Sequence, residues 1–390
     1  MSRPLAYEYT APPLDENAAA LTILKARHVP ELAELHELRR KGWRDAGLDG
    51  HFQTQRKVAD QSTHASEVFW FEMMKKGMKE IDDAVSVLPS QGTPFEFLDI
   101  WSVSLLLLQS SISDHLSTSS RPPMVSSCCP GGFSSFTLNK KRLTKGVGLS
   151  LPASSGGHSF MLENYLRPRY QLIEKDILEY NLAPNVPGTP FLTDMLPDAL
   201  LERFQLVFID GHALRTYASL PVQGKLDDAR EAHVVYRDSL HIAHLIIALE
   251  CVRPGGTIST RLSHPEAFPA SHILYFLDQL SDELAVYKPR TMHTYRGTFY
   301  VVAKGVCRRT PALTELKARY LTGLQQLWSA LRWGGPSGRG RRMSSDDLDF
   351  IVSTEEILGR YLDRLIELGR PVWRTQAQGL HRFFAKKGIE

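Results

Sequence analysis

The sequence predicts an α/β fold with a mostly parallel, seven-stranded sheet and helices on both faces. Three observations lead to this prediction. Short β-rich runs alternate with helical stretches between residues 94 and 307. Several of these runs are continuously apolar, as expected of strands that are buried on both faces. On either side of this region apolar residues recur at three- and four-residue steps, so we expect helical N- and C-terminal extensions.

The β-rich runs and the stretches between them define the expected elements. We expect strands at 95–100, 146–151, 170–173, 204–209, 257–262, 284–287 and 298–303. We expect helices between them at 160–166, 196–203, 229–251 and 270–281. These elements form a sheet domain at 93–307, with the chain before it and after it in separate extensions.

The N-terminal extension covers residues 1–92. A helical pattern runs from Asn17 to Leu88, is interrupted at Pro30, and ends in breaker residues at 89–92. The C-terminal extension covers 308–390, where helical patterns at 312–333, 346–368 and 372–385 surround a Gly/Arg/Ser stretch. We interpret that stretch, 334–345, as a flexible basic linker.

The composition of the whole chain is that of an ordinary globular protein. Its 390 residues are 43% hydrophobic and 23% charged, which excludes fibrous and wholly disordered classes. No apolar run approaches the roughly 18 residues of a membrane span, and residues 1–17 lack the charged-then-apolar order of a secretory signal. We therefore expect an intracellular protein, in the cytoplasm or nucleus, without a membrane association.

Cysteine spacing and net charge limit the other classes. Cys128 and Cys129 are adjacent, while Cys251 and Cys307 are isolated, so neither a disulfide framework nor a zinc spacing is present, and we expect no structural metal. The net charge of +3 does not indicate nucleic-acid binding by itself. Local basic clusters could either neutralise phosphates or be ordinary solvated surface. They comprise Lys140, Lys141, Arg142, Lys145, Arg308, Arg309, Arg332, Arg339, Arg341 and Arg342.

One segment differs from its neighbours. Residues 101–127 are about one-third serine and contain neither lysine nor glutamate. They lie between a strand end and a glycine turn, where α/β proteins use only a few residues. We interpret 101–126 as a translated intron or, alternatively, as a real surface insertion.

A strand ending in a carboxylate and a glycine turn flank this segment. The strand Phe-Glu-Phe-Leu-Asp99-Ile and the turn Cys-Cys129-Pro130-Gly131-Gly132-Phe become continuous when 101–126 is removed. The joined sequence resembles the Asp-x-Gly-x-x-Pro-Gly-Gly strand–turn–helix of S-adenosylmethionine-dependent methyltransferases of the FtsJ/RrmJ type. Glycines let the backbone approach a ligand, and parallel sheets bind ligands at their carboxyl edge.

Later segments resemble further motifs of this family, in the family's order. They are 146–151, 170–177, 206–212, 252–258 and 297–305. The resemblance covers roughly residues 95–305. It implies a class I, Rossmann-like methyltransferase fold, S-adenosylmethionine as the cofactor, and RNA ribose as the leading acceptor of the methyl group.

The resemblance also implies which residues meet the cofactor. They are Asp99, Cys129, Pro130, Gly131, Gly132, Phe133 and Asp176. Asp176 would lie beside the adenine ring. An acidic residue that the family often has after its second strand is missing, because Ser150 is followed by Leu151 and Pro152.

The catalytic lysine–aspartate–lysine–glutamate group of the family is only partly matched. Asp210 matches the aspartate, and Lys75 or Lys76 is the candidate for the first lysine. The second lysine aligns with Arg261, and the glutamate with Thr298. Arginine stays protonated, so it can stabilise negative charge but cannot act as a general base.

Two other functions are alternatives to methyl transfer. The altered positions Arg261 and Thr298 favour a non-catalytic descendant that uses the fold to bind RNA or protein. A nicotinamide-dependent oxidoreductase is disfavoured, because the first turn reads Pro-Gly-Gly and not Gly-x-Gly-x-x-Gly. The sequence therefore predicts a methyltransferase with RNA as its partner, and a binding module is the alternative.

Overall fold

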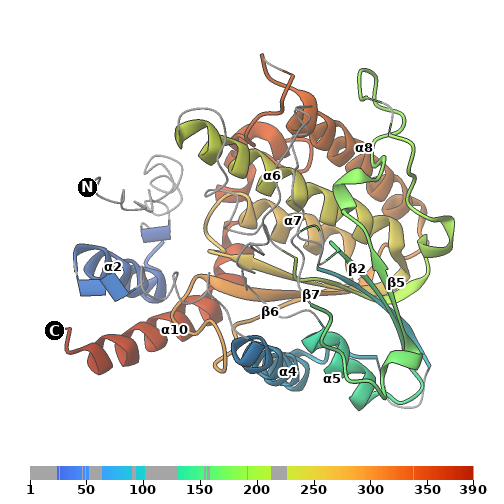
Figure 1. The fold of residues 1–390 in the computed structure, drawn as a ribbon. Coiled ribbons are helices and arrows are strands. Elements are labelled where there is room, and N and C mark those ends of the chain that lie inside the picture. Colours follow the sequence, from blue (N-terminus) through green and yellow to red (C-terminus); the bar gives the residue numbers. More distant parts are fainter. Residues whose placement is uncertain are drawn as a thin grey trace, which may run out of the picture.

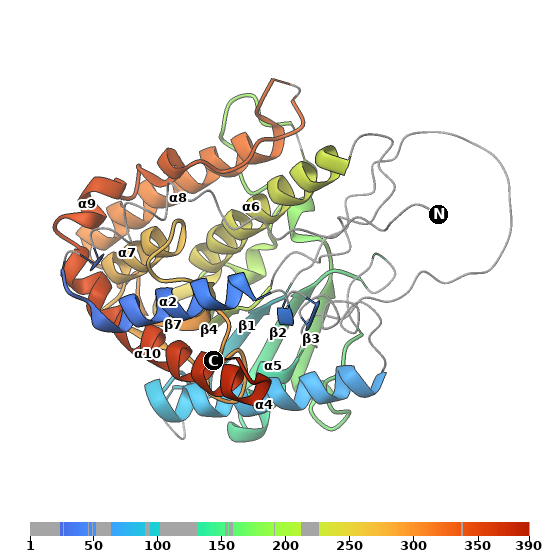
Figure 2. The same ribbon diagram turned by 90° about the vertical axis from the view of Figure 1, so that its left-hand side faces the viewer.

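The structure is a computed structural model with a seven-stranded sheet at its centre and helices on both faces (Figure 1 and Figure 2). It describes residues 24–25, 27–45, 47–48, 50–51, 64–89, 94–101, 131–152, 155, 159–190, 192–211, 226–336 and 338–389. The strands are β1 (Glu96–Ile100), β2 (Lys145–Ser150), β3 (Tyr170–Glu174), β4 (Phe204–Ile209), β5 (Val252–Ser263), β6 (Glu283–Tyr287) and β7 (Thr298–Val306). All seven coincide with predicted β-rich runs.

The strand order is β3-β2-β1-β4-β5-β7-β6, and β7 runs antiparallel to its two neighbours. The other neighbouring strands pair in parallel. This is the strand order of the class I methyltransferases, so the predicted fold class is confirmed. The order reverses between β1 and β4, and open α/β sheets bind ligands in the crevice at such a point.

Three long helices cover one face of the sheet. They are α6 (Leu226–Cys251), α7 (Ala270–Leu280) and α8 (Pro311–Trp333), and Figure 1 shows them above the strands. Their apolar side chains share one core with strand residues such as Val207, Ile258 and Val301. This continuous burial explains the apolar runs of the central strands.

The opposite face is covered by α4 (His64–Val85) and α5 (Gly132–Lys140), below the sheet in Figure 1. Met78 and Phe133 from these helices pack with Phe97, Phe208 and Tyr300 in a second core. The start of α5 lies very close to α4. A Cβ atom at Gly132 would lie 2.6 Å from Met74 Cβ, so this position requires a residue without a side chain.

The two ends of the chain pack against each other beside the sheet. Helix α2 (Pro30–Arg44) lies along α10 (Leu362–Lys387), as Figure 2 shows. Leu32 and Leu35 pack with Trp373 and Phe384 in a third core. The terminal helices therefore share one apolar core, and α10 also contacts β6.

Two predicted helices are wrong. Where we expected helices at 160–166 and 196–203, the structure has irregular chain and single 3-10 turns at Arg167–Arg169 and Asp198–Leu200. Pro168 lies after the first segment, and Pro197 is the second residue of the other, where a helix tolerates proline, so proline alone does not account for either result. The C-terminal pattern at 346–368 is also broken, into a 3-10 turn at Ser345–Leu348 and the short helix α9 (Thr354–Leu358), before α10 begins.

The described part of the Gly/Arg/Ser stretch 334–345, predicted as a flexible basic linker, is held by hydrogen bonds. Arg341 donates two hydrogen bonds of 2.6 Å to Asp347, and the Met343 amide donates to Asp238 of α6 at 3.0 Å. These contacts attach the stretch to the helical face.

Of the predicted insertion 101–126, Trp101 is described and the other residues lie outside the described residues. None of the described helices combines the length and apolar composition of a membrane span.

Candidate active site

Two predicted carboxylates come together where β1 and β4 end. Asp99 is the fourth residue of β1, and Asp210 directly follows β4. In the parallel register Asp99 is opposite Phe208, so Asp210 lies slightly nearer the carboxyl edge. Both side chains are buried, with exposures of 3% and 7%. The charge of Asp210 contributes to a higher pKa of Asp99, which shows that the two groups interact.

The Asp99 carboxyl group is enclosed by polar and aromatic side chains. Burial raises its pKa to about 7, although a hydrogen bond from the Ser134 hydroxyl opposes the shift. Ser134 Oγ also lies 3.3 Å from the Tyr170 hydroxyl oxygen. A Cβ atom at Gly148 would lie 2.2 Å from that oxygen, so glycine at this position makes room for Tyr170. At neutral pH Asp99 is therefore poised between its neutral and charged forms.

The glycine turn lies beside an aromatic stack. Gly131 has a φ of +96°, a left-handed conformation that favours glycine. A Cβ atom there would lie 3.9 Å from the ring of Phe160. Phe160 stacks on Tyr170 at 5.4 Å and on Trp101 at 6.3 Å between ring centroids. The described part of the turn therefore meets the strand end that carries Asp99.

The predicted cofactor residues have different surroundings. Asp99 and Gly131 fit a cofactor site, because they place a carboxyl group and bare backbone at the carboxyl edge. Phe133 contributes its ring to the core, 5.6 Å from Phe208, and Gly132 permits the close approach of α4. Asp176 accepts a hydrogen bond of 2.9 Å from the Leu178 amide, and burial raises its pKa to about 6. Cys129 and Pro130 lie outside the described residues.

Arg261, which aligns with the second lysine of the family, pairs with Asp210 in the structure. Its Nε atom lies 3.2 Å from Asp210 Oδ1, and its side chain is 13% exposed. Tyr300 is opposite Arg261 in the antiparallel register, and its hydroxyl donates to the same carboxylate oxygen at 3.4 Å. Burial raises the pKa of Asp210, whereas the guanidinium and the tyrosine hydroxyl lower it. The three side chains form a buried Asp210–Arg261–Tyr300 cluster at the ends of β4 and β5.

The two lysine candidates have other partners. Lys75 Nζ lies 3.0 Å from Glu72 and 3.0 Å from Glu163. Burial lowers the pKa of Lys75, but the two carboxylates outweigh it, and the net shift is upward. Lys75 is therefore held in its charged form, unlike a general base. Lys76 is exposed on α4.

Thr298 begins β7 next to a lysine that the sequence did not single out. Lys288 is 3% exposed, and its Nζ donates to the backbone carbonyls of His293, Arg296 and Thr298. Burial lowers the pKa of Lys288 to about 7. Three donated hydrogen bonds require the ammonium form, because a neutral amine has only two N–H groups. Lys288 thus fixes the loop between β6 and β7.

This loop carries a second residue that sequence reasoning missed. His293 has a φ of +58°, which is uncommon for a residue with a side chain. Burial and the nearby charges of Arg261, Arg296 and Lys288 lower its pKa to about 3, so the imidazole is neutral at physiological pH. No sequence signal pointed to it, because its proximity to Arg261 depends on the shape of the loop.

A buried ion pair attaches the terminal helices to the same edge. Arg39 of α2 lies 2.6 Å from Glu266, which follows β5, and Trp373 of α10 donates to Glu266 at 2.7 Å. Burial would raise the pKa of Glu266, but Arg39 and His264 lower it to about 2. Glu266 is therefore ionised and links three distant parts of the sequence.

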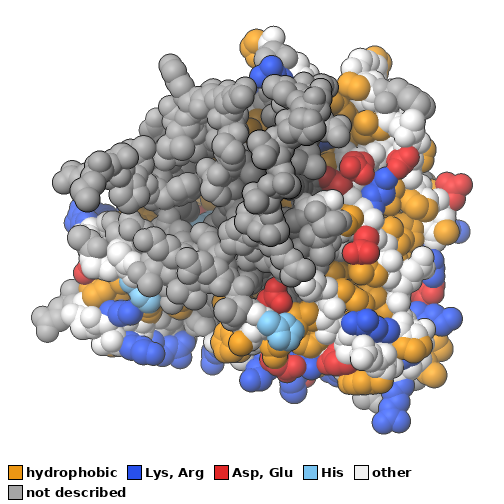
Figure 3. All heavy atoms as spheres, viewed as in Figure 1, with side chains coloured by type: hydrophobic (Ala, Val, Ile, Leu, Met, Phe, Trp, Pro, Cys, Tyr) orange, Lys and Arg blue, Asp and Glu red, His pale blue; other side chains and the backbone are white. Residues whose placement is uncertain are grey.

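Several members of the predicted basic clusters have partners within the protein. Lys140 pairs with Asp82, and Lys141 donates to the Pro89 carbonyl. Figure 3 shows Lys and Arg side chains along the lower rim, near α4 and α5, with carboxylates between them. This rim is a mixed surface and not a continuous basic patch. Within the described residues no group of three His, Cys, Asp or Glu side chains is arranged to hold a metal ion.

Comparison with known proteins relates the chain to methyltransferases. No family model matches it. It is 26% identical over 190 residues to the cap-specific mRNA (nucleoside-2'-O-)-methyltransferase 1 of Danio rerio, a match that covers 48% of this chain and 22% of that protein. The chain therefore spans about a fifth of the length of that relative.

Similar solved structures include a ribosomal RNA methyltransferase from Plasmodium falciparum, with 14% identity, a TM-score of 0.34, and coverage of 60% of this chain and 97% of that chain. Another is human methyltransferase-like protein 13 in complex with SAH, with 11% identity, a TM-score of 0.27, and coverage of 68% and 92%. These structural similarities are weak. The strand order is that of the class I methyltransferase fold, and the sequence match is to a methyltransferase over about half of this chain.

Proposed function

We propose that this chain is an S-adenosylmethionine-dependent methyltransferase that modifies the ribose 2′-hydroxyl of RNA. The observation that carries the proposal is the Asp210–Arg261 pair at the carboxyl edge, beside Asp99 at the reversal of strand order. The 2'-O-methyltransferase named among its relatives supports RNA as the acceptor. Because the match covers only part of that relative, the acceptor belongs to the proposal.

The arrangement suggests a role for each group. S-adenosylmethionine, when bound, supplies an electrophilic methyl group. The acceptor hydroxyl gains negative charge when it releases its proton to water, and the fixed charge of Arg261 would stabilise that oxygen until it attacks the methyl group. Asp210 holds the guanidinium at Nε, and Tyr300 holds Asp210. Asp99 and Gly131 position the cofactor, so that alignment of the acceptor with the methyl group supplies much of the rate.

Lys75 needs a separate test, because it is a predicted catalytic residue that is bound to Glu163. We compare Lys75→Met with Glu163→Gln. If Lys75 takes part in the reaction, Lys75→Met lowers kcat far more than Glu163→Gln does. If it only attaches the 159–166 segment to α4, the two substitutions have similar effects on kcat and on stability.

A second function is favoured by a specific observation. Both predicted lysine positions are unsuited to proton abstraction, since Lys75 is held charged and position 261 is an arginine. The alternative is therefore a non-catalytic protein that uses this fold to bind RNA or protein. Such a protein would bind its partner with the same affinity whether or not S-adenosylmethionine is present.

Calorimetric titration of S-adenosylmethionine into the chain and into a version lacking 101–126 is the first experiment. Transfer of a labelled methyl group to RNA is then measured for the wild type and for Arg261→Lys with Thr298→Glu. We expect cofactor binding that Asp99→Ala weakens at least tenfold, about 1.4 kcal/mol, and faster transfer by the double variant. If neither version binds S-adenosylmethionine, the proposal of an enzyme is overturned and the non-catalytic binding module is favoured.

A further inference from the structure

An open groove lies at the edge of the sheet opposite the candidate active site. Its volume is about 630 Å³, and it is lined by Glu202, Arg253, Pro254, Gly255, Arg308, Arg309 and Thr310. These residues come from the turn before β4, the start of β5 and the chain after β7. Arg253 and Arg261 are eight positions apart on β5, and the regular part of the strand from Thr257 to Arg261 alone corresponds to about 13 Å at the usual rise of a strand. The groove is therefore separate from the Asp210–Arg261–Tyr300 cluster.

Cations outnumber carboxylates around this groove. Arg309 and Lys317 share Glu202, and Arg308 pairs with Asp282. Arg253 is exposed and has no ion-pair partner among the described residues. The groove thus has one guanidinium without a carboxylate and others in exposed pairs, which contribute little to stability and can exchange partners.

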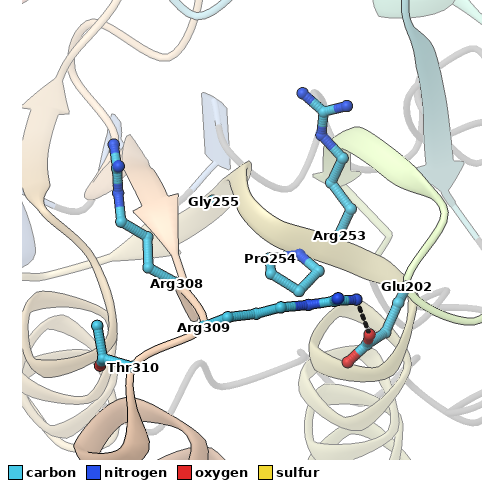
Figure 4. Close-up of a pocket in the computed structure, with 7 residues that line it drawn as sticks. All are labelled: Glu202, Arg253, Pro254, Gly255, Arg308, Arg309 and Thr310. Atoms are coloured by element: carbon cyan, nitrogen blue, oxygen red, sulfur yellow. Dashed lines mark hydrogen bonds and ion pairs between the residues drawn. The ribbon is translucent and has the colours of Figure 1, made fainter.

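The arginine side chains of the groove are accessible to a ligand from solvent. Figure 4 shows Arg253 and Arg308 on the two sides of the Pro254–Gly255 turn, pointing in the same direction, while Arg309 extends across the groove to Glu202. Gly255 has a φ of +79° and presents bare backbone between the two guanidinium groups. Helix α8, 23 residues long and capped by Thr310, begins at the groove and adds the partial positive charge of its N-terminus.

We propose that this groove binds the phosphodiester backbone of RNA. Guanidinium groups are suited to phosphate oxygens, which they can contact with two hydrogen bonds. Apart from Pro254, the lining has no apolar side chain that could anchor a protein segment, and protein interfaces depend on such anchors. The inference rests on the proposed function, since an RNA acceptor longer than the reacting nucleotide would reach beyond the carboxyl edge and contact this second surface.

The test uses the full chain and fluorescently labelled single-stranded RNA, with affinity measured by anisotropy at several salt concentrations. The variants are Arg253→Ala and Arg253→Ala with Arg308→Ala. The matched control is Arg382→Ala, an exposed arginine on α10. Each lost phosphate contact should weaken binding about threefold, so the double variant loses about tenfold, and its salt slope falls by about 1.4. The control should bind like the wild type.

Length dependence sharpens the result. An RNA of about four nucleotides is too short to contact the groove and the carboxyl edge together, so the double variant should weaken its binding less than it weakens the binding of an RNA several times longer. Every variant should bind S-adenosylmethionine with the same affinity as the wild type. Polyglutamate is added as a competitor, and we expect most of the RNA to remain bound in its presence.

The outcomes separate this inference from the proposed function. The groove is overturned as an RNA site if the double variant binds RNA as tightly as the wild type, or if the wild type does not bind RNA. Methyl transfer is assayed separately, so neither result decides the proposed function. Competition by polyglutamate as strong as that by RNA also overturns it, in favour of an acidic protein partner. Groove-dependent RNA binding without any methyl transfer supports the inference and overturns only the catalytic proposal.

Discussion

The two edges of the same sheet use charged residues in opposite ways. At the carboxyl edge Asp210 and Arg261 are buried together, and Glu266 is buried with Arg39. At the other edge Arg308 and Arg309 are 61% and 79% exposed. A buried charge needs its partner in order to exist in the fold, while an exposed charge is free to attract a partner from outside. The comparison predicts that matched substitutions at the two edges have very different costs.

The largest effect is expected for Arg261→Met. This substitution leaves Asp210 buried without its cation, and breaking a buried pair costs about 3–5 kcal/mol. The free energy of unfolding is measured by urea denaturation. The double variant Asp210→Asn, Arg261→Met removes both charges and should recover much of the loss, because the two effects are not additive for residues in contact. A loss of less than about 0.5 kcal/mol in the single variant, as for a surface site, would contradict the comparison.

The second effect concerns pH. The pKa of Glu266 is about 2 in the folded protein, below its usual value of 4.5. A lowered pKa means that Glu266 stabilises the fold above pH 4.5 and that this contribution is lost as the pH falls towards 2. The full contribution is about 3 kcal/mol, since each pKa unit corresponds to about 1.4 kcal/mol.

Glu266→Gln is the control for this prediction. The difference in unfolding free energy between the wild type and Glu266→Gln should be constant from pH 7 to pH 5 and should shrink from pH 4.5 to pH 3. A difference that is independent of pH over the whole range would show that the Glu266 carboxylate is not held ionised by Arg39.

The sequence predicted the strands well and the site only in part, for a physical reason. A strand that is buried on both faces is continuously apolar, so the runs of β1, β4 and β7 can be recognised from local composition. The carboxylates Asp99 and Asp210 were recognisable because they come at strand ends. The pairing of Arg261 with Asp210 depends on how β5 lies beside β4, and the position of His293 depends on the loop that Lys288 fixes.

Contacts between distant segments were equally invisible in the sequence. Arg39 and Glu266 are separated by 227 positions, and neither belongs to a motif. The segment at 160–166 was predicted as a helix from its local composition, but its residues instead pack against the glycine turn, through Phe160, and against α4, through Glu163. Tertiary contacts override local propensity in such segments.

Substitutions at two glycines should have effects on stability of intermediate size. Gly148→Ala, near the buried edge, would place a methyl group 2.2 Å from the Tyr170 hydroxyl oxygen, and overpacking of this kind costs about 1–3 kcal/mol. Gly255→Ala, in the groove, has only a contact of 3.8 Å with Arg308 but requires a left-handed residue, which costs about 1–2 kcal/mol. The variant Tyr170→Phe should relieve Gly148→Ala in part and leave Gly255→Ala unchanged. Thermal unfolding of the three single variants and of the two double variants that combine Tyr170→Phe with each glycine substitution separates a steric cause from a conformational one.

The smallest effect on stability is expected for Arg253→Ala. Its side chain is exposed and pairs with no described carboxylate, so its removal should change the free energy of unfolding by less than about 0.5 kcal/mol. The same variant should weaken RNA binding about threefold. Urea denaturation and anisotropy on one protein preparation therefore compare the two roles directly. If Arg253→Ala were as destabilising as Arg261→Met, Arg253 would be part of the folded framework, and the contrast between the two edges would fail at the residue where it is strongest.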